Sequence, residues 1–371
     1  MEKICILQNS LNYGGTDTFV INLCEGLVKD GYDVTVVLSI DKNDTNQRLD
    51  DFQNTGAHII WTCSLGNIKK KIKHLLLLYN ELKKGRYDVF QTNIDLFNGP
   101  NVFIAWLARI PIRECHSHNS QQSRELQAGK TLKVKLYQKI MRWLCWTFSN
   151  RRGGCSAIAM DFLFKEKWKN DKYSKVVHNG IELTDYMTSF DINKKKRELD
   201  LKRKYNICTV GRISYQKNPL FIVDVMRELF LKRDDCDFVW VGSGDMEEQI
   251  QDKIADYKIA DRMHMLGLRK DVSEILRSTD IFFLPSYFEG LAIVLIEAQA
   301  AGLPCVTAST TPLESNCGSL LYLPLEESVS DWAQTLSDIL DGKIELKVDP
   351  EKLNEYSIGH MVKEMEGLFE V

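Results

Sequence analysis

Short apolar runs alternate with amphipathic segments along the first half of the chain. The apolar runs are rich in β-branched and aromatic residues and predict buried strands at residues 3–8, 33–39, 57–62, 88–93 and 112–118. The segments between them repeat apolar residues at helical spacing, which predicts helices over residues 18–29, 68–84 and 102–108. Strands that alternate with helices are typical of a parallel sheet covered by helices on both faces.

The second half of the chain repeats this scheme. Its apolar runs predict strands at residues 207–211, 238–244, 281–286 and 304–309. Its amphipathic segments predict helices over residues 219–231, 246–257, 272–277 and 291–301. The sequence therefore predicts an α/β protein with two doubly wound, Rossmann-like domains, which bind ligands at the carboxyl ends of their strands.

A polar, highly charged segment at residues 183–204 predicts the boundary between the two domains. We expect an N-terminal domain over residues 1–185 and a C-terminal domain over residues 186–354. A last helical segment within residues 355–371 is expected to pack back on the first domain.

Composition narrows the class of protein. Apolar residues make up 44% of the 371 residues and charged residues 27%, as in a folded globular protein. The ten cysteines are scattered without a CxxC pair, which indicates reduced, mostly buried thiols and a cytoplasmic location. No long uncharged apolar stretch predicts a membrane span, and the first residues lack the pattern of a signal peptide.

Charge is divided unevenly along the chain. Residues 1–180 hold 26 Lys and Arg against 17 Asp and Glu, which gives +9, whereas the remaining 22 and 34 give −12. Residues 52–80 and 126–160 contain no acidic residue. Residues 130–149 therefore predict either a basic amphipathic helix at an anionic membrane surface or an ordinary helix whose apolar side fills the core. The negative total charge disfavours a nucleic-acid partner.

The segment PSYFEGLAIVLIE at residues 285–297 follows a predicted strand. Glu289 and Gly290 are predicted to open the helix that carries Glu297. This helix start would leave four backbone N–H groups free, those of Leu291, Ala292, Ile293 and Val294. Free N–H groups and the helix dipole stabilise an anion such as a diphosphate, and Gly290 allows it to come close. The alternative is an ordinary helix start with one favourable and one solvated acid.

Two cations follow another predicted strand in the segment TVGRISYQKNP, residues 209–219. Arg212 and Lys217 flank the turn before the next helix. Cations at the carboxyl end of a strand can neutralise a diphosphate leaving group. The alternative for each residue is an ordinary basic position in a surface loop.

The first strand is followed by a pair of glycines, Gly14 and Gly15, in residues 9–18. Glycine allows a ligand to pass close to the backbone. The pattern is not GxGxxG, so a nicotinamide cofactor lacks its main support.

Histidines close the predicted strand at residues 112–118. Cys115, His116 and His118 suggest zinc, but alternate residues of a strand point to opposite faces, so the three do not converge. We expect a polar contact from His118 to a substrate, with a structural histidine as the alternative.

In this order, the four motifs resemble glycosyltransferase family 4, whose GT-B fold places two Rossmann-like domains on either side of a central cleft. The resemblance covers nearly the whole chain, and its strongest part is the E-x7-E pattern of Glu289 and Glu297. The segment HSHNS, at residues 116–120, is most similar to enzymes of capsular and exopolysaccharide synthesis. Further matches are Gly211, Arg212, Lys217, Asn218, VGSG at 241–244, Gly267, Leu268 and HNGI at 178–181.

The resemblance implies roles for individual residues. Arg212 and Lys217 would grip the diphosphate, Glu289 the donor sugar and Glu297 the ribose. His118 would lie near the reacting face of the sugar and join Glu289, Arg212 and Lys217 in catalysis. Other donor-binding residues would be Gly15, Gly242, Gly267 and Leu268, together with the helix start at 290–294. The acceptor side would include Gly14, Thr16, His116 and Asn119.

The resemblance also implies a reaction. The enzyme would be a retaining hexosyltransferase that needs no cofactor and no metal, takes its sugar from a nucleotide-diphosphate donor, with UDP favoured, and extends a lipid-linked glycan. It would work in the cytoplasm or on the inner face of the membrane. The alternatives are a GT-B enzyme with a soluble acceptor, a sugar-nucleotide epimerase, or a non-catalytic scaffold. Asp235 and Asp237 fit the DxD pattern of metal-dependent transferases, but we interpret them as a solvated turn at the opposite sheet edge.

Overall fold

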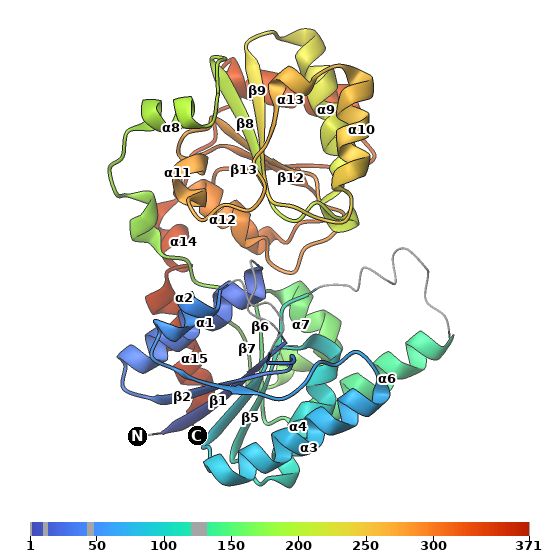
Figure 1. Ribbon diagram of the computed structural model, residues 1–371, viewed down its shortest axis with the longest axis vertical. Helices are drawn as coiled ribbons and strands as arrows, with labels where there is room; N and C mark the ends of the chain where they lie inside the picture. Colours follow the sequence, from blue (N-terminus) through green and yellow to red (C-terminus); the bar gives the residue numbers. More distant parts are fainter. Residues whose placement is uncertain (1, 10–13, 43–47, 120–131, 371) are drawn as a thin grey trace. The chain divides into compact units, whose positions relative to one another are not determined.

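The computed structural model describes residues 2–9, 14–42, 48–119 and 132–370. The chain divides into two compact units (Figure 1). Unit 1 contains Met1–Ile181 and Glu355–Val371, and unit 2 contains Glu182–Asn354.

Unit 1 is built on a parallel sheet of seven strands in the order β3-β2-β1-β4-β5-β6-β7. The strand order reverses between β1 and β4, so their carboxyl ends flank the place where doubly wound sheets bind ligands. The strands are β1 (Lys3–Gln8), β2 (Asp33–Leu38), β3 (His58–Trp61), β4 (Val89–Thr92), β5 (Ile112–Ser117), β6 (Arg151–Gly154) and β7 (Ser174–Val176).

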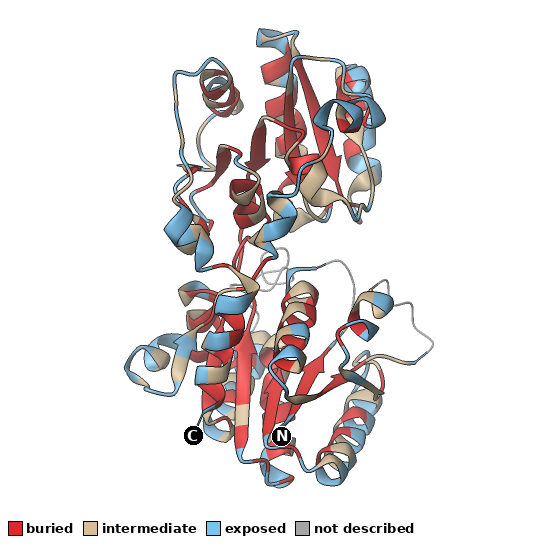
Figure 2. Ribbon diagram, turned by 90° about the vertical axis from the view of Figure 1, so that its left-hand side faces the viewer, coloured by how far each residue is buried: buried red, intermediate tan, exposed pale blue. Residues whose placement is uncertain are grey.

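Helices cover both faces of this sheet, and Figure 2 shows its strands as mostly buried. Alternation along β1 sends Ile4 and Ile6 to one core cluster and Cys5 and Leu7 to the other. The helices are α1 (Gly15–Lys29), α2 (Leu49–Gln53), α3 (Ile68–Gly85), α4 (Asn98–Leu107), α6 (Leu132–Phe148), α7 (Ala157–Phe164) and α15 (Ile358–Phe369), with 3-10 turns η1 (Asp95–Phe97) and η2 (Lys165–Asn170).

Unit 2 repeats this architecture with a parallel sheet of six strands in the order β10-β9-β8-β11-β12-β13. The strand order reverses between β8 and β11. The strands are β8 (Tyr205–Val210), β9 (Cys236–Val241), β10 (Met263–Met265), β11 (Ile281–Leu284), β12 (Cys305–Ala308) and β13 (Leu320–Leu323). Within β9, Phe238 and Trp240 enter one core cluster while Val239 and Val241 enter the other.

The helices of unit 2 follow the same two-sided arrangement (Figure 1). They are α8 (Ile192–Glu198), α9 (Pro219–Lys232), α10 (Glu247–Tyr257), α11 (Val272–Leu276), α12 (Ile293–Ala300), α13 (Val329–Leu340) and α14 (Pro350–Asn354). Four 3-10 turns join them, namely η3 (Leu183–Tyr186), η4 (Tyr215–Lys217), η5 (Ala260–Arg262) and η6 (Leu313–Ser315).

The last helix, α15, belongs to the core of unit 1. Its Met361 and Val362 join the cluster that contains Phe19 of α1. A Cβ atom on Gly26 of α1 would lie only 2.2 Å from the Cγ2 atom of Val362, so glycine lets the two helices approach closely. The N–H of Ile181 also donates to the carbonyl oxygen of Tyr356 at 2.7 Å, which joins the segment that leaves unit 1 to the segment that returns.

The predicted parallel α/β class is confirmed, and most predicted elements lie within a few residues of their observed bounds. Four strands, β6, β7, β10 and β13, were not predicted. The prediction of buried cysteines without disulfide bonds is confirmed, because all ten are free, buried thiols. Within the described ranges, no helix combines the length and the hydropathy that crossing a bilayer requires.

Candidate functional site

A buried ion pair joins the loops that follow β8 and β11, at the point where the strand order of unit 2 reverses. The Nζ atom of Lys217 lies 2.7 Å from Oε1 of Glu289, and Glu289 is only 5% exposed. Lys217 ends η4, and the next residue, Asn218, has a φ of 54°. This left-handed residue turns the chain into α9, whose first residue is Pro219.

Gln216 was not singled out from the sequence, yet it connects the same two loops. Its side-chain amide donates to the carbonyl oxygen of Phe288 at 3.0 Å and to Oε2 of Glu289 at 3.3 Å. Its backbone carbonyl accepts from the N–H of Tyr287 at 2.9 Å. Tyr287 also stacks on Tyr215 with ring centroids 4.8 Å apart. These contacts fix the two loops that carry Lys217 and Glu289 relative to each other.

Arg212 lies outside this buried cluster. Its side chain is 73% exposed, and a guanidinium nitrogen lies 3.6 Å from Oδ1 of Asp245. An exposed pair at this distance contributes little to stability. The guanidinium is therefore open to an anion that approaches the carboxyl end of β8.

Glycines pack backbone against backbone at the carboxyl ends of β8 and β9. The N–H of Gly242 donates to the carbonyl oxygen of Gly267 at 2.8 Å. A Cβ atom on Gly242 would lie 2.1 Å from the carbonyl oxygen of Gly211, and one on Gly244 would lie 2.1 Å from that of Ile213. The predicted donor-binding residues Gly242 and Gly267 thus shape this edge, and Leu268 beside them is 48% exposed.

Gly242→Ala is expected to destabilise unit 2 by about 3 kcal/mol or more, because the added methyl group meets backbone that cannot move aside. Its φ of 137° adds to the strain. The matched control is Gly302→Ala, which also has a positive φ, of 82°, but no atom within 4 Å of the added Cβ. Urea unfolding of both variants measures the difference, and equal losses would contradict the steric argument.

The helix start after Glu289 differs from the prediction. Helix α12 begins at Ile293, two residues later than expected, with Ala292 as its N-cap. The N–H of Ile293 donates to the carbonyl oxygen of Leu291 at 2.9 Å, so the prediction that this group is free was wrong. Gly290, Leu291 and Ala292 are buried in this turn, and Val294 is buried at the start of α12.

Glu297 lies inside α12 and is half-buried. Burial first, and then the charges of Glu297 and Asp185, raise the pKa of Tyr186 well above its ordinary value. This places the phenol of η3 near the Glu297 carboxylate, a neighbour that the sequence did not indicate.

In unit 1, His118 and Asn93 meet at the carboxyl ends of β4 and β5. The Nε2 atom of His118 lies 2.8 Å from Oδ1 of Asn93, whose Nδ2 donates to the carbonyl oxygen of Leu7 at 3.4 Å. Because the amide oxygen faces the ring, Nε2 must carry the proton and Nδ1 must be a bare acceptor. Nδ1 has no hydrogen-bond partner among the described residues, and the side chain is 7% exposed.

Burial and the neighbouring ring of His116 lower the pKa of His118 well below its ordinary value. The imidazole therefore stays neutral at physiological pH and keeps Nδ1 available as an acceptor. Asn93 was not singled out from the sequence, although it is the last residue of the strand predicted at 88–93 and follows β4 directly in the structure, at the carboxyl edge of the sheet.

His116 lies beneath His118 and not at the surface. Its ring is fully buried, stacks on Phe19 at 4.7 Å, and its Nδ1 lies 3.1 Å from Oε1 of Glu114. A Cβ atom on Gly153 of β6 would come within 2.5 Å of both partners, so glycine makes room for them. Burial lowers the pKa of His116 to about 3 and raises that of Glu114. His116 therefore supports His118 and presents no atom to an acceptor.

The remaining predicted residues of unit 1 lie at the same sheet edge. Gly14 and Gly15 are exposed at the amino-terminal end of α1, and Thr16 is half-buried. Gly14 has an extended backbone, with a φ of −147°, so its conformation does not require glycine. The side-chain amide of Asn119 donates to Oδ2 of Asp95 at 2.6 Å.

The interpretation of Asp235 and Asp237 as a solvated turn was wrong for Asp237. Its side chain is fully buried at the start of β9 and lies 2.8 Å from a guanidinium nitrogen of Arg203. Burial opposes its ionisation, but the nearby His264 ring and hydrogen bonds from Arg203 and from the backbone N–H of Lys202 lower the pKa of Asp237 to about 2. Asp237 therefore forms a structural ion pair with Arg203 at the amino-terminal end of β9. Among the described residues, no three His, Cys, Asp or Glu side chains are grouped to bind a metal.

The predicted residues therefore form two groups. Lys217 and Glu289 are in contact within unit 2, with Arg212 on the same strand end, and His118 lies with Asn93 in unit 1. Each group lies at the carboxyl edge of its sheet, which is the edge that doubly wound sheets use to bind ligands.

Comparisons with known proteins agree with this arrangement. Residues 13–185 match the family described as Glycosyltransferase Family 4, and residues 190–352 match Glycosyl transferases group 1. An uncharacterized glycosyltransferase of Haemophilus influenzae is 30% identical over 318 residues, which span 84% of this chain and 82% of the relative.

Two further comparisons concern an enzyme of Escherichia coli and a solved structure. The UDP-Gal:alpha-D-GlcNAc-diphosphoundecaprenol alpha-1,3-galactosyltransferase of Escherichia coli is 30% identical over 254 residues, which span 67% of this chain and 64% of that enzyme. HepE of Anabaena, solved in complex with UDP and glucose, is similar with a TM-score of 0.83 at 15% identity over 99% of both chains. The structural likeness confirms the predicted GT-B fold, and together with the family matches it identifies the chain as a glycosyltransferase of the GT-B class, a hexosyltransferase of the family 4 type.

Proposed function

We propose that this glycosyltransferase moves a hexose from a UDP-sugar to a lipid-linked glycan intermediate in the synthesis of a cell-surface polysaccharide. The transfer would retain the anomeric configuration and need no divalent metal. The observation that carries the proposal is the buried Lys217–Glu289 pair between the loops that follow β8 and β11. The name of the Escherichia coli relative, which pairs a UDP-sugar with a diphosphoundecaprenol-linked acceptor, supports both substrate classes.

In the proposed reaction, the bond between C1 of the hexose and the β-phosphate oxygen breaks. A bond between C1 and the acceptor oxygen forms on the same face of the sugar, and the acceptor proton passes to the departing phosphate. UDP leaves with the bonding electrons, so negative charge grows on its diphosphate. Lys217, held by Glu289, and the exposed Arg212 would stabilise that charge.

His118 would contribute through the bare Nδ1 atom. A buried acceptor that has no partner in the described part of the chain is costly, and a hydroxyl group of the sugar would satisfy it. Glu289 would also accept hydrogen bonds from hydroxyl groups of the donor sugar, through Oε2, the oxygen that Gln216 contacts at 3.3 Å. Because the acceptor is lipid-linked, the enzyme would work in the cytoplasm at the inner face of the membrane.

A thermal-shift comparison of UDP-, GDP- and ADP-sugars tests the donor. UDP-sugars at about a hundred times their dissociation constant should add about 2.7 kcal/mol and raise the melting temperature of unit 2 by roughly 5 to 10 °C. The other two donors should produce no shift at the same concentration. A shift with GDP- or ADP-sugars alone would contradict the choice of UDP.

Transfer measured in EDTA tests the proposed independence from metal. Activity should be unchanged, because Lys217 and Arg212 would take the place of a cation at the diphosphate. A strict requirement for Mn²⁺ or Mg²⁺ would contradict the mechanism, as would a product of inverted anomeric configuration.

A further inference from the structure

Helices α3, α4 and α6 of unit 1 carry an outward face of large apolar side chains, here called the docking face. On α6, Leu132 is 82% exposed, and Leu136, Ile140 and Trp143 are between 45% and 58% exposed. These four residues therefore do not fill the core, whereas another side of α6 does, through the buried Cys145 and through Met141 and Trp146, which pack against the core cluster. The docking face also includes Ile68, Ile72 and Leu76 of α3, and Trp106 and Leu107 of α4.

Helix α3 is apolar on two sides. His74, Leu78 and Leu82 are spaced four residues apart and are buried against the sheet. Ile68, Ile72 and Leu76 have the same spacing, yet their side chains are exposed by 70%, 54% and 62%. One apolar stripe is enough to hold a surface helix on a core, so the second stripe requires another partner.

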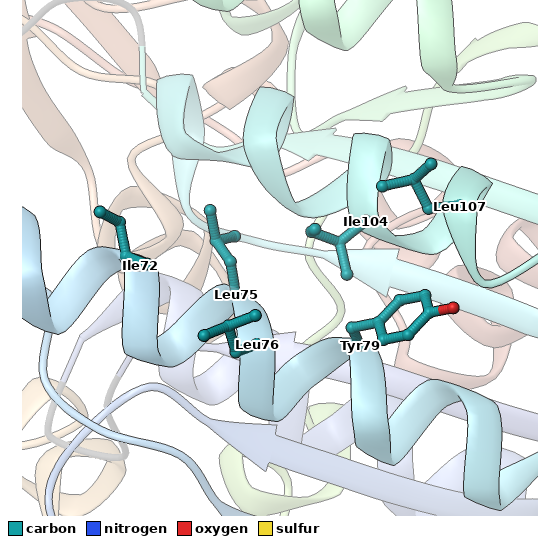
Figure 3. A pocket seen from close by; sticks show the side chains of 6 residues that line it. All are labelled: Ile72, Leu75, Leu76, Tyr79, Ile104 and Leu107. Atoms are coloured by element: carbon teal, nitrogen blue, oxygen red, sulfur yellow. The ribbon is translucent and has the colours of Figure 1, made fainter.

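The docking face continues from α3 to α4, and Figure 3 shows apolar side chains of these two helices around a shared groove. A groove of about 300 Å³ lies between α3 and α4, and its walls are Ile72, Leu75, Leu76, Tyr79, Ile104 and Leu107. Next to it, Trp106 of α4 packs on Phe148 of α6 with ring centroids 5.1 Å apart. The ring of Trp143 on α6 also packs edge-on against Phe148, with centroids 6.0 Å apart, which extends the face onto α6.

Lysines outnumber carboxylates on the helices of the docking face, although Lys70 of α3 is paired with Asp41 at 2.8 Å. Helix α3 holds six lysines, α6 holds three lysines and one arginine, and α4 holds no charged residue. The single carboxylate of the three helices is Glu81, which accepts a hydrogen bond from Tyr87. At 100° per residue, Lys133, Lys135 and Lys139 flank the exposed stripe of α6, and all three are exposed.

We propose that the docking face lies on an anionic lipid bilayer, with hydrocarbon chains in the groove between α3 and α4 and lysines at the headgroups. Apolar residues in line with flanking cations are the pattern of a helix at an anionic interface. A second copy of this chain fits poorly, because a two-fold contact would place these lysines against each other. The inference rests on the proposed function in one respect, since a lipid-linked acceptor brings the enzyme to a bilayer.

Sedimentation of the full chain with vesicles tests the proposal. Vesicles of phosphatidylglycerol and phosphatidylcholine in equal parts should bind the protein, and vesicles of phosphatidylcholine alone should bind it at least tenfold more weakly. Leu76→Ser and Trp143→Ser should each lower the affinity about tenfold, because each removes one large apolar contact. Lys139→Gln should lower it about fivefold at low salt and less at high salt.

The matched control is Leu231→Ser, which removes a leucine that is 68% exposed on α9 of unit 2 and should not change vesicle binding. Equal binding to both vesicle types, or equal losses in the control, would overturn the proposal. It would also be overturned if the wild-type chain were a dimer that Trp143→Ser converts to a monomer.

The thermal shift with UDP-sugars should persist in every variant. Its absence in the wild type would contradict the donor, whereas absent vesicle binding beside an intact shift would contradict only the docking face.

Discussion

Lys217→Ala is expected to lower kcat for sugar transfer roughly a hundredfold to a thousandfold. The ammonium group lies 2.7 Å from the Glu289 carboxylate and is held there by a loop that Gln216 fixes, so it is preorganised to meet charge on a departing diphosphate. Alanine removes that charge and leaves the buried carboxylate without its cation. Initial rates with saturating donor and acceptor measure the effect.

The matched control for this variant is Lys253→Ala. Lys253 lies 2.6 Å from Asp224 in the same unit, between α10 and α9, and away from the loops after β8 and β11. It should lose little activity, since a more exposed pair contributes less than about 1 kcal/mol to stability. Full activity in Lys217→Ala, or an equal loss in Lys253→Ala, would contradict a role for the Lys217–Glu289 pair in transfer.

Asn93→Asp is expected to make the enzyme sensitive to acid. In the wild-type chain, burial and His116 lower the pKa of His118, so the ring stays neutral and activity should not depend on this group near neutral pH. A carboxylate in place of the amide would favour the imidazolium and raise that pKa. Below the raised pKa, Nδ1 carries a proton and no longer accepts, so kcat should fall about tenfold per pH unit.

Two variants complete this experiment. Asn93→Ala removes the acceptor that orients the ring, so it should lower activity about equally at every pH. Asn101→Asp is the matched control, because Asn101 forms another buried Asn–His pair in unit 1, with His74 at 3.3 Å. A flat pH profile in Asn93→Asp, or the same acid sensitivity in Asn101→Asp, would contradict the assignment of Nδ1 as the active acceptor.

Much of the fold could be predicted because most of its strands are runs of apolar residues that alternate with amphipathic helices. The strand β6 could not, because its sequence is Arg-Arg-Gly-Gly. Gly153 makes room for the buried Glu114 and His116 side chains of the neighbouring strand, and Gly154 makes room for Met160 of α7. A need for space between neighbouring elements produces no periodic pattern in the sequence of either one.

The candidate site shows the same limit. Lys217 and Glu289 could be proposed one at a time, from their places after predicted strands and from the family resemblance. Their contact across 72 positions of sequence, and the part of Gln216 in it, depend on β8 and β11 being neighbours in the sheet. The exposure of Trp143 could not be predicted either. Helical spacing shows which residues share one side of a helix but not which side faces the core.

Unit 1 is interrupted in sequence by unit 2, and this has a consequence for synthesis on the ribosome. Met361 and Val362 fill the core beside α1, yet they emerge only after all of Glu182–Asn354 has been translated. At ordinary translation speeds that delay is roughly 10 to 35 s. The nascent N-terminal part must therefore wait with an uncovered apolar surface along α1, the kind of surface that chaperones bind. Termination of translation near residue 354 would leave that surface permanently uncovered.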